Sequence, residues 1–600
     1  MAVNWLAVVS AQDQRLLPCA EMAPFFHGVA SGDPLADRVI LWTRLTPDEP
    51  GITFEVHWRV ALDSGMSQLH SMGSTLAVAE HDFTVKVDVA GLSPNHWYYY
   101  DFRYGDQYSR RGRTRTLPEG GTMPFRMAVA SCSNYEYGYF NAYRVLAARD
   151  DIDLVLHLGD YIYEYQTGVY SANLEDRTHF PENEVIALED YRLRYSHYRL
   201  DPDLQEAHRQ LPWIAVWDDH ESAGNAWKDG AYNHNEGEGL WSERKAASVK
   251  AYYEWMPVRE EEEGIVRRCF KIGDLIDLYM LDTRLEGRDE QVEYGSPEAD
   301  SPERSLLGIS QKDWLSMLLS EPPALWTVFG QQVMMAPLEL FGNGVNPDQW
   351  DGYRSDRLWL YNELQLTNRS NIVVLTGDVH SSWANDLPLE TYNEESNTGS
   401  IGVEYVVTSV TSPTLSLNIN EGLIPMLNPH VQYVDLEKHG FALIDFDVNR
   451  VQSDWIHVNT LEFPDEGFSV GASFLCREGQ SWLESAPAAL PSNDNGVPKA
   501  PVCPFTGVSS VAELSPRLIS VYPNPFFDRV VVQFALWYPE DPIVTLYDTA
   551  GKVLYRKQIK GTGTGINYLE IKGLNFSPGG YILAISGADG RSSVWMLQKN

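Results

Sequence analysis

Four apolar runs in the middle of the chain each end in a short cluster of polar residues. The runs are rich in Val, Ile and Leu, which is typical of strands buried on both faces of a sheet. Functional groups gather at the carboxyl ends of strands in α/β and layered folds, so we expect these clusters to share one site. The runs are MPFRMAVASC, ending at Cys132; LVLHLGDYIYE, with Asp160 and Tyr163; PWIAVWDDHE, with Asp219 and His220; and NIVVLTGDVHSSW, with Asp378 and His380.

The first part of the chain alternates between apolar and polar positions. In ITFEVHWRVA, Ile52, Phe54, Val56, Trp58 and Val60 alternate with polar residues, and FTVKVDV repeats the pattern. A period of two is that of a half-buried strand. We predict a β-sandwich over residues 22–120.

The remaining chain divides into a long mixed region, a linker and a final set of short strands. Residues 121–485 combine apolar strands with amphipathic helices, which predicts a sheet-on-sheet core flanked by helices, an αββα arrangement. Residues 486–513 are rich in Pro, Ser and Asn and read as a linker. Residues 514–600 predict a small β-sandwich, so the fold class is layered α+β. Residues 1–21 form a candidate signal-peptide remnant that lacks a Lys/Arg-rich start.

Composition narrows the range of partners. The 600 residues carry 46 Lys+Arg against 83 Asp+Glu, a net charge of −37. Such a surface argues against nucleic-acid binding, beyond a nucleic acid as substrate, and against adhesion to anionic lipid. A phosphate-ester substrate would be repelled, so cations and a few arginines must reverse the sign of the charge locally.

The five cysteines are an odd number, which points to one free thiol in an exported protein. We expect Cys132 to be that thiol and to act as a ligand. Cys476 and Cys503 are one candidate disulfide across the linker, and spacing does not fix the pairing of these two or of Cys19 and Cys269.

The residue types at the four strand ends favour a mixed metal centre. Asp160 follows a glycine, and its two carboxylate oxygens can bridge two cations. The Tyr163 phenolate and the Cys132 thiolate favour Fe³⁺ over Ca²⁺ or Mg²⁺. Hard Ca²⁺ ions suit oxygen ligands. One Fe³⁺ and one or two Ca²⁺ are therefore expected, with ligands drawn from Cys132, Asp160, Tyr163, Asp219, Asp378 and His380.

Several neighbouring residues have two readings each. His220 is the expected acid that protonates the leaving group, and a role as metal ligand is the alternative. Asp218 and Glu221 either bind calcium or orient ligands, and Asn225 is a weaker candidate. Arg354, like Arg357, either neutralises substrate phosphate or forms a structural salt bridge. His157 lies inside an apolar strand and is expected to be a hydrogen-bonded core residue.

The ordered set of motifs resembles the PhoD-type alkaline phosphatases among the calcineurin-like metallophosphoesterases. The general phosphoesterase pattern is Asp-x-His, Gly-Asp, Gly-Asn-His and Gly-His-x-His. This chain has instead Ser131–Cys132–Ser133, Gly159–Asp160, Asp218–Asp219–His220 and Gly377–Asp378–Val379–His380, which are the departures expected of PhoD-type enzymes. The resemblance implies an Fe³⁺ held by Cys132, Asp160, Tyr163 and His380, and Ca²⁺ held through Asp160, Asp219 and Asp378. The motifs are HGVASGDPLADRVILWTRL, ASCSNYEYGYFNAYR, LHLGDYIYEY, WIAVWDDHESAGNAW, FGQQVMMAPL, WDGYRSDR and LTGDVHSSW.

The last block resembles the type A sorting domain of type IX secretion. The resemblance rests on Tyr522–Pro523–Asn524–Pro525, the Asp548–Gly551–Lys552 turn and Pro578–Gly579–Gly580–Tyr581. It implies export across both membranes by the type IX machinery, followed by release or attachment to the cell surface. A carbohydrate-binding or adhesive β-module is the alternative, although the block has no clear aromatic platform.

Together these features predict a secreted, monomeric phosphatase that acts on small phosphate monoesters. A metal-bridging oxide or hydroxide is expected to attack phosphorus in a single displacement that releases inorganic phosphate. One alternative is a phosphodiesterase acting on nucleotide, teichoic-acid-like or phospholipid headgroup esters. Another is a non-catalytic metal-binding protein at the cell surface, against which the complete ligand set and His220 argue.

Overall fold

The structure is a computed structural model that describes most of the chain from Met22 to Lys599. The expected N-terminal segment and Cys503 lie outside the described residues, as do Pro523 and Pro525 of the sorting motif. Within 22–599 the gaps are residues 48–50, 294–295, 297, 300, 415–420, 490–495, 502–515, 523, 525, 537–539, 561, 563–564 and 588–591.

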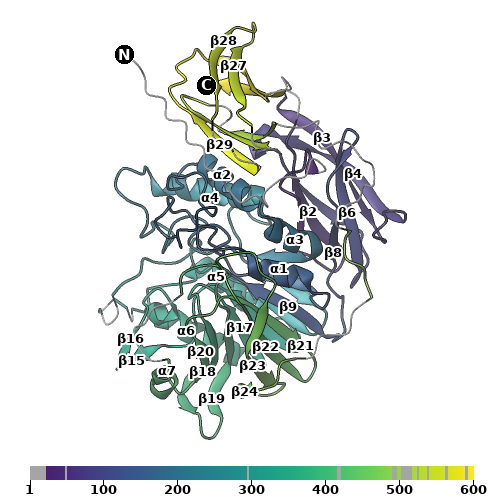
Figure 1. The fold of residues 1–600 in the computed structure, drawn as a ribbon. Helices are drawn as coiled ribbons and strands as arrows, with labels where there is room; N and C mark the ends of the chain where they lie inside the picture. Colours follow the sequence, from purple (N-terminus) through teal and green to yellow (C-terminus); the bar gives the residue numbers. More distant parts are fainter. Residues whose placement is uncertain are drawn as a thin grey trace.

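Two large sheets face each other across one apolar core in the middle of the molecule (Figure 1). Their order is β24-β23-β22-β21-β9-β10-β11-β1-β2-β5 and β12-β13-β14-β17-β19-β18-β20. The first comprises β1 (Val29–Gly32), β2 (Arg38–Arg44), β5 (Thr84–Ala90), β9 (Phe125–Ala130), β10 (Leu154–His157), β11 (Pro212–Ala215), β21 (Gly440–Phe446), β22 (Arg450–Val458), β23 (Phe468–Arg477) and β24 (Glu484–Ser485). The second comprises β12 (Arg268–Ile272), β13 (Ile276–Met280), β14 (Trp326–Gln331), β17 (Ile372–Thr376), β18 (Ser382–Asn393), β19 (Thr398–Val406) and β20 (Val431–Asp435).

The strands that carry the polar clusters run parallel at the centre of each sheet. β9, β10 and β11 pair in parallel in the first sheet, and β13, β14, β17 and β19 do so in the second. Every residue of β9, β10, β11 and β17 is buried, as continuous apolar runs predict. The loops that follow β9, β10, β11 and β17 therefore emerge at one edge of the core.

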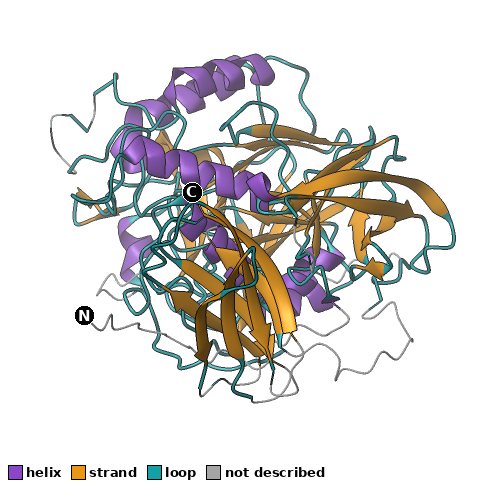
Figure 2. Ribbon diagram, turned by 90° about the horizontal axis from the view of Figure 1, so that it is seen from above, coloured by secondary structure: helices purple, strands orange, loops and turns teal. Residues whose placement is uncertain are grey.

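Helices α1 (Asn141–Ala148) and α3 (Pro202–Gln210) pack on the first sheet, and α5 (Gly308–Leu319) and α6 (Arg354–Leu366) pack on the second. Trp213 of β11 stacks on His208 of α3 and contacts Tyr143 of α1. Leucines of α5 and α6 pack with residues of β13, β14 and β17. The helices are α1 (Asn141–Ala148), α2 (Leu188–Tyr198), α3 (Pro202–Gln210), α4 (Trp241–Trp255), α5 (Gly308–Leu319), α6 (Arg354–Leu366) and α7 (Leu423–Leu427), with 3-10 turns at Ala79–His81 and Trp350–Tyr353. Strands dominate the molecule throughout (Figure 2).

The N-terminal region departs from the free-standing sandwich that alternation predicts. β1 pairs in parallel with β11, so β1, β2 and β5 extend the central ten-stranded sheet. The second layer is a separate sheet of β3 (Thr53–Ala61), β4 (Leu69–Val78), β6 (Trp97–Tyr104), β7 (Gln107–Tyr108) and β8 (Gly112–Arg115). Phe54, Val56 and Val60 of the alternating run face its core, whereas Ile52 is 76% exposed.

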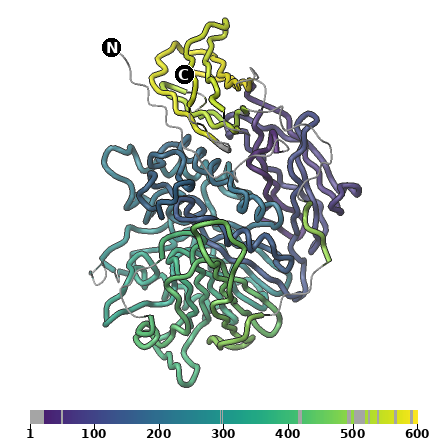
Figure 3. The backbone as a smooth tube through the Cα atoms, in the orientation of Figure 1, coloured from purple at the N-terminus to yellow at the C-terminus, as the bar shows by residue number. Residues whose placement is uncertain are grey.

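The C-terminal region forms two small sheets that lie against the N-terminal strands and α2 (Figures 1 and 3). They are β25 (Arg517–Tyr522), β26 (Val530–Leu536) and β29 (Gly565–Ile571), and β27 (Ile543–Asp548), β28 (Val553–Gln558), β30 (Gly579–Ser586) and β31 (Ser592–Lys599). A short pair, β15 (Glu339–Leu340) and β16 (Asn343–Gly344), lies elsewhere in the central region. None of the described helices is long and apolar enough to span a membrane.

Candidate metal centre

The structure brings the ends of four strands together into three overlapping groups of ligand atoms. Within each group, one atom of every residue lies within 4.8 Å of the others. Asp160 and Asp219 each belong to two groups, so neighbouring groups share a carboxylate. The groups are Cys132–Asp160–His380, Asp160–Asp219–His220 and Asp218–Asp219–Asp378.

The backbone at the strand ends adopts a conformation that non-glycine residues seldom take. Cys132, Asp160, Asp378 and His380 have φ angles of 60°, 56°, 61° and 55°. Left-handed φ values at several ligands in one place are typical of a functional site, where surrounding structure holds local strain. The apolar strands fix each turn on one side, and the loop contacts fix it on the other.

Gly159 has a specific steric role in this arrangement. Its φ is +102°, and a Cβ atom added there would lie 2.4 Å from the backbone nitrogen of Asp218. The lack of a side chain therefore lets the Asp160 loop approach the Asp218 loop closely.

Tyr163 and Cys132 are buried beside Asp160. The Tyr163 hydroxyl donates to Asp160 Oδ2 at 2.8 Å and lies 3.2 Å from His380 Nε2. Ser412 Oγ donates to the same hydroxyl at 2.6 Å. Burial and the charge of Asp160 raise the pKa values of the Tyr163 phenol and the Cys132 thiol well above their usual range. Both groups would therefore ionise only next to a strong local positive charge.

His220 is held by a carboxylate that the sequence analysis did not select. Its Nδ1 lies 2.7 Å from Glu164 Oε2, and its Nε2 lies 4.0 Å from Asp219 Oδ2. Glu164 also accepts bonds from Gly224 N and Asn233 Nδ2. Burial lowers the pKa of His220, but the charges of Glu164, Asp219 and Asp160 outweigh burial and raise it well above its usual range.

Arg284 is the second residue that sequence reasoning missed. Its guanidinium is fully buried and donates to Asp218 Oδ1 at 2.5 Å, to Asp348 Oδ2 at 2.7 Å and to Asp378 Oδ1 at 2.7 Å. It also lies 3.3 Å from Asp219 Oδ1. Arg284 therefore arranges the acidic side of the centre. The only signal was a charged residue directly after an apolar strand, in LYMLDTRL.

The remaining candidate residues either belong to a ligand group or hold the surrounding loops in place. Glu221 accepts the backbone N–H groups of Asp160, Tyr161 and Asp218, so it fixes both loops. Asn225 donates its backbone N–H to Asp219 Oδ2 at 2.5 Å and has a φ of 53°. Asp218 belongs to one ligand group and also pairs with Arg284.

Arg354, Arg357 and His157 make contacts outside the ligand groups. Arg354 forms an ion pair with Glu339 at 3.7 Å, and Arg357 donates to Asp351 at 2.7 Å. These contacts match the salt-bridge alternative. His157 is buried, as predicted: it stacks on Trp213 and lies 3.0 Å from the Tyr143 hydroxyl. Burial lowers its pKa to about 3.

Cys476 does not form the candidate disulfide with Cys503. Cys476 is buried with a free thiol, and its Sγ donates to the carbonyl oxygen of Gln480 at 3.5 Å. Cys132 and Cys269 are free as well. Cys476 lies at the buried end of β23, where it packs as a small apolar residue.

The donor set fits metal ions. Asp218 Oδ2 is buried without a hydrogen-bond partner among the described residues, as expected of an atom that faces a ligand site. Burial and the negative charges of Asp348, Asp219 and Asp160 raise the pKa of Asp378 to about 7. The positive charge of Arg284 lowers it, but by less than these effects raise it. This crowding of carboxylates is relieved by divalent or trivalent cations.

Comparison with known proteins identifies the family of the chain. A sequence model of the PhoD-like phosphatase matches residues 127–455, and one of the PhoD-like phosphatase N-terminal domain matches residues 12–118. Alkaline phosphatase D of Bacillus subtilis (strain 168) is 36% identical over 500 residues, which is 79% of this chain and 84% of the relative. The chain belongs to the PhoD-like phosphatase family. It is an enzyme of the PhoD alkaline phosphatase type.

A solved structure supports the same assignment. The protein described as "Structure of PhoD" shares 35% identity with this PhoD-like phosphatase at a TM-score of 0.72. The match covers 78% of this chain and 93% of that one. The PhoD-like fold therefore extends over the central sheets and the N-terminal strands, and the C-terminal region is additional.

That additional region contains the sorting signal of the enzyme. A secretion system C-terminal sorting domain matches residues 520–596. The sorting interpretation of this region is thus confirmed over a carbohydrate-binding module, and it indicates export to the cell surface or the medium. This PhoD-like phosphatase is a secreted enzyme with candidate metal-binding groups at the ends of its central strands.

Proposed function

We propose that this secreted phosphatase hydrolyses small phosphate monoesters and releases inorganic phosphate, working as a monomer. The observation that carries the proposal is the arrangement of three ligand groups joined through Asp160 and Asp219. Shared carboxylates of this kind suit adjacent cations that grip one phosphoryl group. The acidic surface makes such a local reversal of charge necessary for any phosphate ester.

We further propose how the residues divide among the ions. Cys132, Asp160, Tyr163 and His380 would hold Fe³⁺, because a buried thiol and phenol with raised pKa values ionise best next to a strong Lewis acid. Asp160, Asp219 and Asp378, with Asp218 beside them, would hold Ca²⁺ through oxygen. When bound, such ions supply positive charge that stabilises the phosphoryl oxygens in the transition state.

The protein's own groups orient the substrate and handle the proton. Glu164 holds the ring of His220 through Nδ1, which leaves Nε2 to give a proton to the oxygen of the departing alcohol. Arg284 and Glu221 keep the carboxylates and both loops in place during turnover. An oxygen from water forms the new bond to phosphorus as the bond to the ester oxygen breaks, so the alcohol leaves with the proton from His220 and inorganic phosphate is released.

The test of the proposed activity compares a simple aryl phosphate monoester with the matching diester at alkaline pH, before and after a chelator. We expect chelator-sensitive monoester turnover that returns when Fe³⁺ and Ca²⁺ are restored, with much less turnover of the diester. Preference for the diester would favour a phosphodiesterase. Turnover that survives complete metal removal would contradict the proposed centre.

The proposed iron ligand can be tested by colour. An Fe³⁺–phenolate bond gives a visible absorption band, so Tyr163→Phe should remove the band and lower iron content. Tyr165→Phe is the matched control, because its ring also contacts His220, whereas the hydroxyl that bonds Asp160 belongs to Tyr163. A colourless yet fully active enzyme would rule out the iron assignment.

A further inference from the structure

The seam between the C-terminal module (residues 516–599) and the rest of the molecule is built from specific buried contacts. The Tyr568 ring stacks on Phe180 with centroids 3.7 Å apart, and its hydroxyl lies 2.8 Å from His197 Nδ1. Gln533 Nε2 donates to the same hydroxyl, and Ser196 Oγ donates to Gln533 Oε1 at 3.3 Å. All five side chains are less than 9% exposed.

A second anchor uses a residue of the sorting motif itself. The Tyr522 hydroxyl donates to Asp82 Oδ2 at 2.6 Å and accepts a bond from Arg44 at 2.9 Å. Arg44 and Asp82 form a buried ion pair at 2.8 Å. Each polar group at this anchor therefore has its partner across the seam, as a specific interface requires.

Apolar packing joins the same two parts. One core cluster contains side chains of β2 and β5 together with side chains of β26, β27, β30 and β31. Phe83 meets Trp595 edge to face across it, with centroids 6.2 Å apart. A module tethered only by a linker would not share a core with the enzyme.

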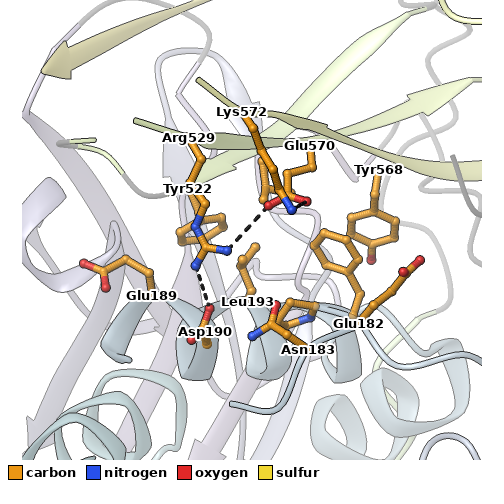
Figure 4. Close-up of a pocket in the computed structure, with 13 residues that line it drawn as sticks. Glu182, Asn183, Glu189, Asp190, Leu193, Tyr522, Arg529, Tyr568, Glu570 and Lys572 are labelled. Atoms are coloured by element: carbon orange, nitrogen blue, oxygen red, sulfur yellow. Dashed lines mark hydrogen bonds and ion pairs between the residues drawn. The ribbon is translucent and has the colours of Figure 1, made fainter. Parts of the chain in front are cut away.

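The rim of the seam is polar and partly open. A cavity of about 380 Å³ lies between α2 and β26–β29, and Arg529 spans it to Asp190 and Glu570 at 3.5 Å each (Figure 4). Phe180, Tyr522 and Tyr568 line the same cavity, so the anchor contacts lie directly beside it. Contacts between domains of one chain are commonly of this mixed, more polar kind.

Helix α2 connects the seam to the metal centre. Ser196 and His197 face the module, while Arg194 of the same helix donates to the carbonyl oxygens of Tyr163, Tyr165 and Phe180. The backbone that presents Tyr163 is therefore held by a helix whose other side is covered by the module.

We propose that the C-terminal sorting module is also a docked structural part of the enzyme. It binds a surface formed by α2, Phe180, Arg44 and Asp82, and through α2 it steadies the segment from Tyr163 to Pro181. The occupant of this surface is the chain's own module, and the proposal holds whatever substrate the phosphatase takes.

The experiment nicks the full chain instead of shortening it. A protease recognition sequence is inserted after Ser509, and the purified protein is cut and passed through a sizing column. We expect the two fragments to elute together. Separation of two folded fragments in native buffer would overturn the proposal.

Paired substitutions identify the contacts that hold the module. Tyr522→Phe with Tyr568→Phe keeps both rings and removes the two hydroxyls at the anchors. We expect this variant to release the nicked module, to lower the melting temperature of the uncut chain by about 2–4 °C, and to speed amide exchange in peptides covering residues 163–181. Tyr581→Phe is the control, because its hydroxyl bonds Ser577 within the module. Equal behaviour of the double variant and the control would refute the assigned contacts.

Discussion

At the scale of single residues, the proposed centre depends on groups that hold the candidate ligands as much as on those ligands themselves. Glu164 bonds the ring of His220, and Glu221 accepts bonds from the backbone of the loops. Arg284 donates to the carboxylates. Groups of this kind are held by their own bonds, so that a ligand keeps one orientation. The side chain most open to a clean test is Glu164, because its charge is the largest influence that raises the pKa of His220.

Replacing Glu164 by Gln should lower turnover most for substrates with poor leaving groups. Without the carboxylate charge, the pKa of His220 falls and the proton is less available, so kcat for an alkyl phosphate should drop about 10–100-fold. An aryl phosphate with a good leaving group needs little proton donation and should lose much less. The measurement is kcat for a series of leaving groups.

Asn233→Ala provides the comparison for that series. Asn233 donates to Glu164 Oε1 at 2.8 Å, so its loss weakens the support of Glu164 without removing the charge. We expect a smaller drop in kcat that depends less on the leaving group. If Glu164→Gln slowed alkyl and aryl esters equally, Glu164 would have a purely structural role.

At the scale of strands and helices, apolar periodicity predicted the buried central strands and the convergence of their ends. The reason is local: a run such as LVLHLGD must be buried, and the polar residue after it must leave the sheet. Arg284 and Asp348 were not predictable in this way, because they approach the centre from loops whose paths depend on packing over long sequence separations. For the same reason, the HGVASG segment gave no sign that β1 continues the central sheet, since its four residues show no alternation.

The junction between β1 and β11 predicts a strong effect of a small substitution. A Cβ atom on Gly32 would lie 2.2 Å from the carbonyl oxygen of Pro257 and 2.8 Å from that of Trp213. Neither backbone atom can move without disturbing the sheet, so Gly32→Ala should reduce the free energy of unfolding by about 1–3 kcal/mol. Chemical denaturation followed by fluorescence measures the change.

Gly580→Ala is a suitable control for the Gly32 substitution. The nearest atom to a Cβ there is the Thr549 methyl carbon at 3.4 Å, an ordinary contact in strand β30. We expect little change in the unfolding curve of this variant. A Gly32→Ala protein as stable as the control would mean that the β1–β11 junction is looser than the structure shows.

At the scale of the whole molecule, the interior carries many buried histidines beneath an acidic surface. Burial lowers the pKa values of His27, His157, His179, His197 and His208 below the usual value. Each is therefore neutral in the folded protein at pH values where an unfolded chain would bind a proton. Every such group favours unfolding as the pH falls below about 6.5.

The expected result is a loss of stability in mild acid. The pKa of His157 is about 3 in the folded protein and 6.5 in an unfolded chain. Its contribution to the free energy of unfolding is therefore fully present above pH 6.5 and is lost as the pH falls toward about 3. The free energy of unfolding should drop by about 1.4 kcal/mol per pH unit for this residue alone. His157→Gln should flatten the pH dependence between pH 6.5 and 4, even though it lowers stability at neutral pH.

His70→Gln serves as the reference for the pH series. His70 lies on β4, where its side chain is exposed and its ring contacts the edge of Tyr98. The change of slope should be greater in His157→Gln than in this variant, because His157 is the one of the two that is buried. An unchanged slope in His157→Gln would indicate that His157 takes up its proton inside the folded protein.

The ten-stranded sheet has a consequence for the order in which the chain can fold. β9, made from residues 125–130, has β21, made from residues 440–446, as one of its two neighbours. During synthesis this apolar strand has a bare edge until some three hundred further residues have appeared, and bare edges invite pairing with other chains. Folding before β21 is available would therefore leave this edge of β9 unpaired. A chain that stops before β21 would be more prone to aggregate than one that lacks only the C-terminal module.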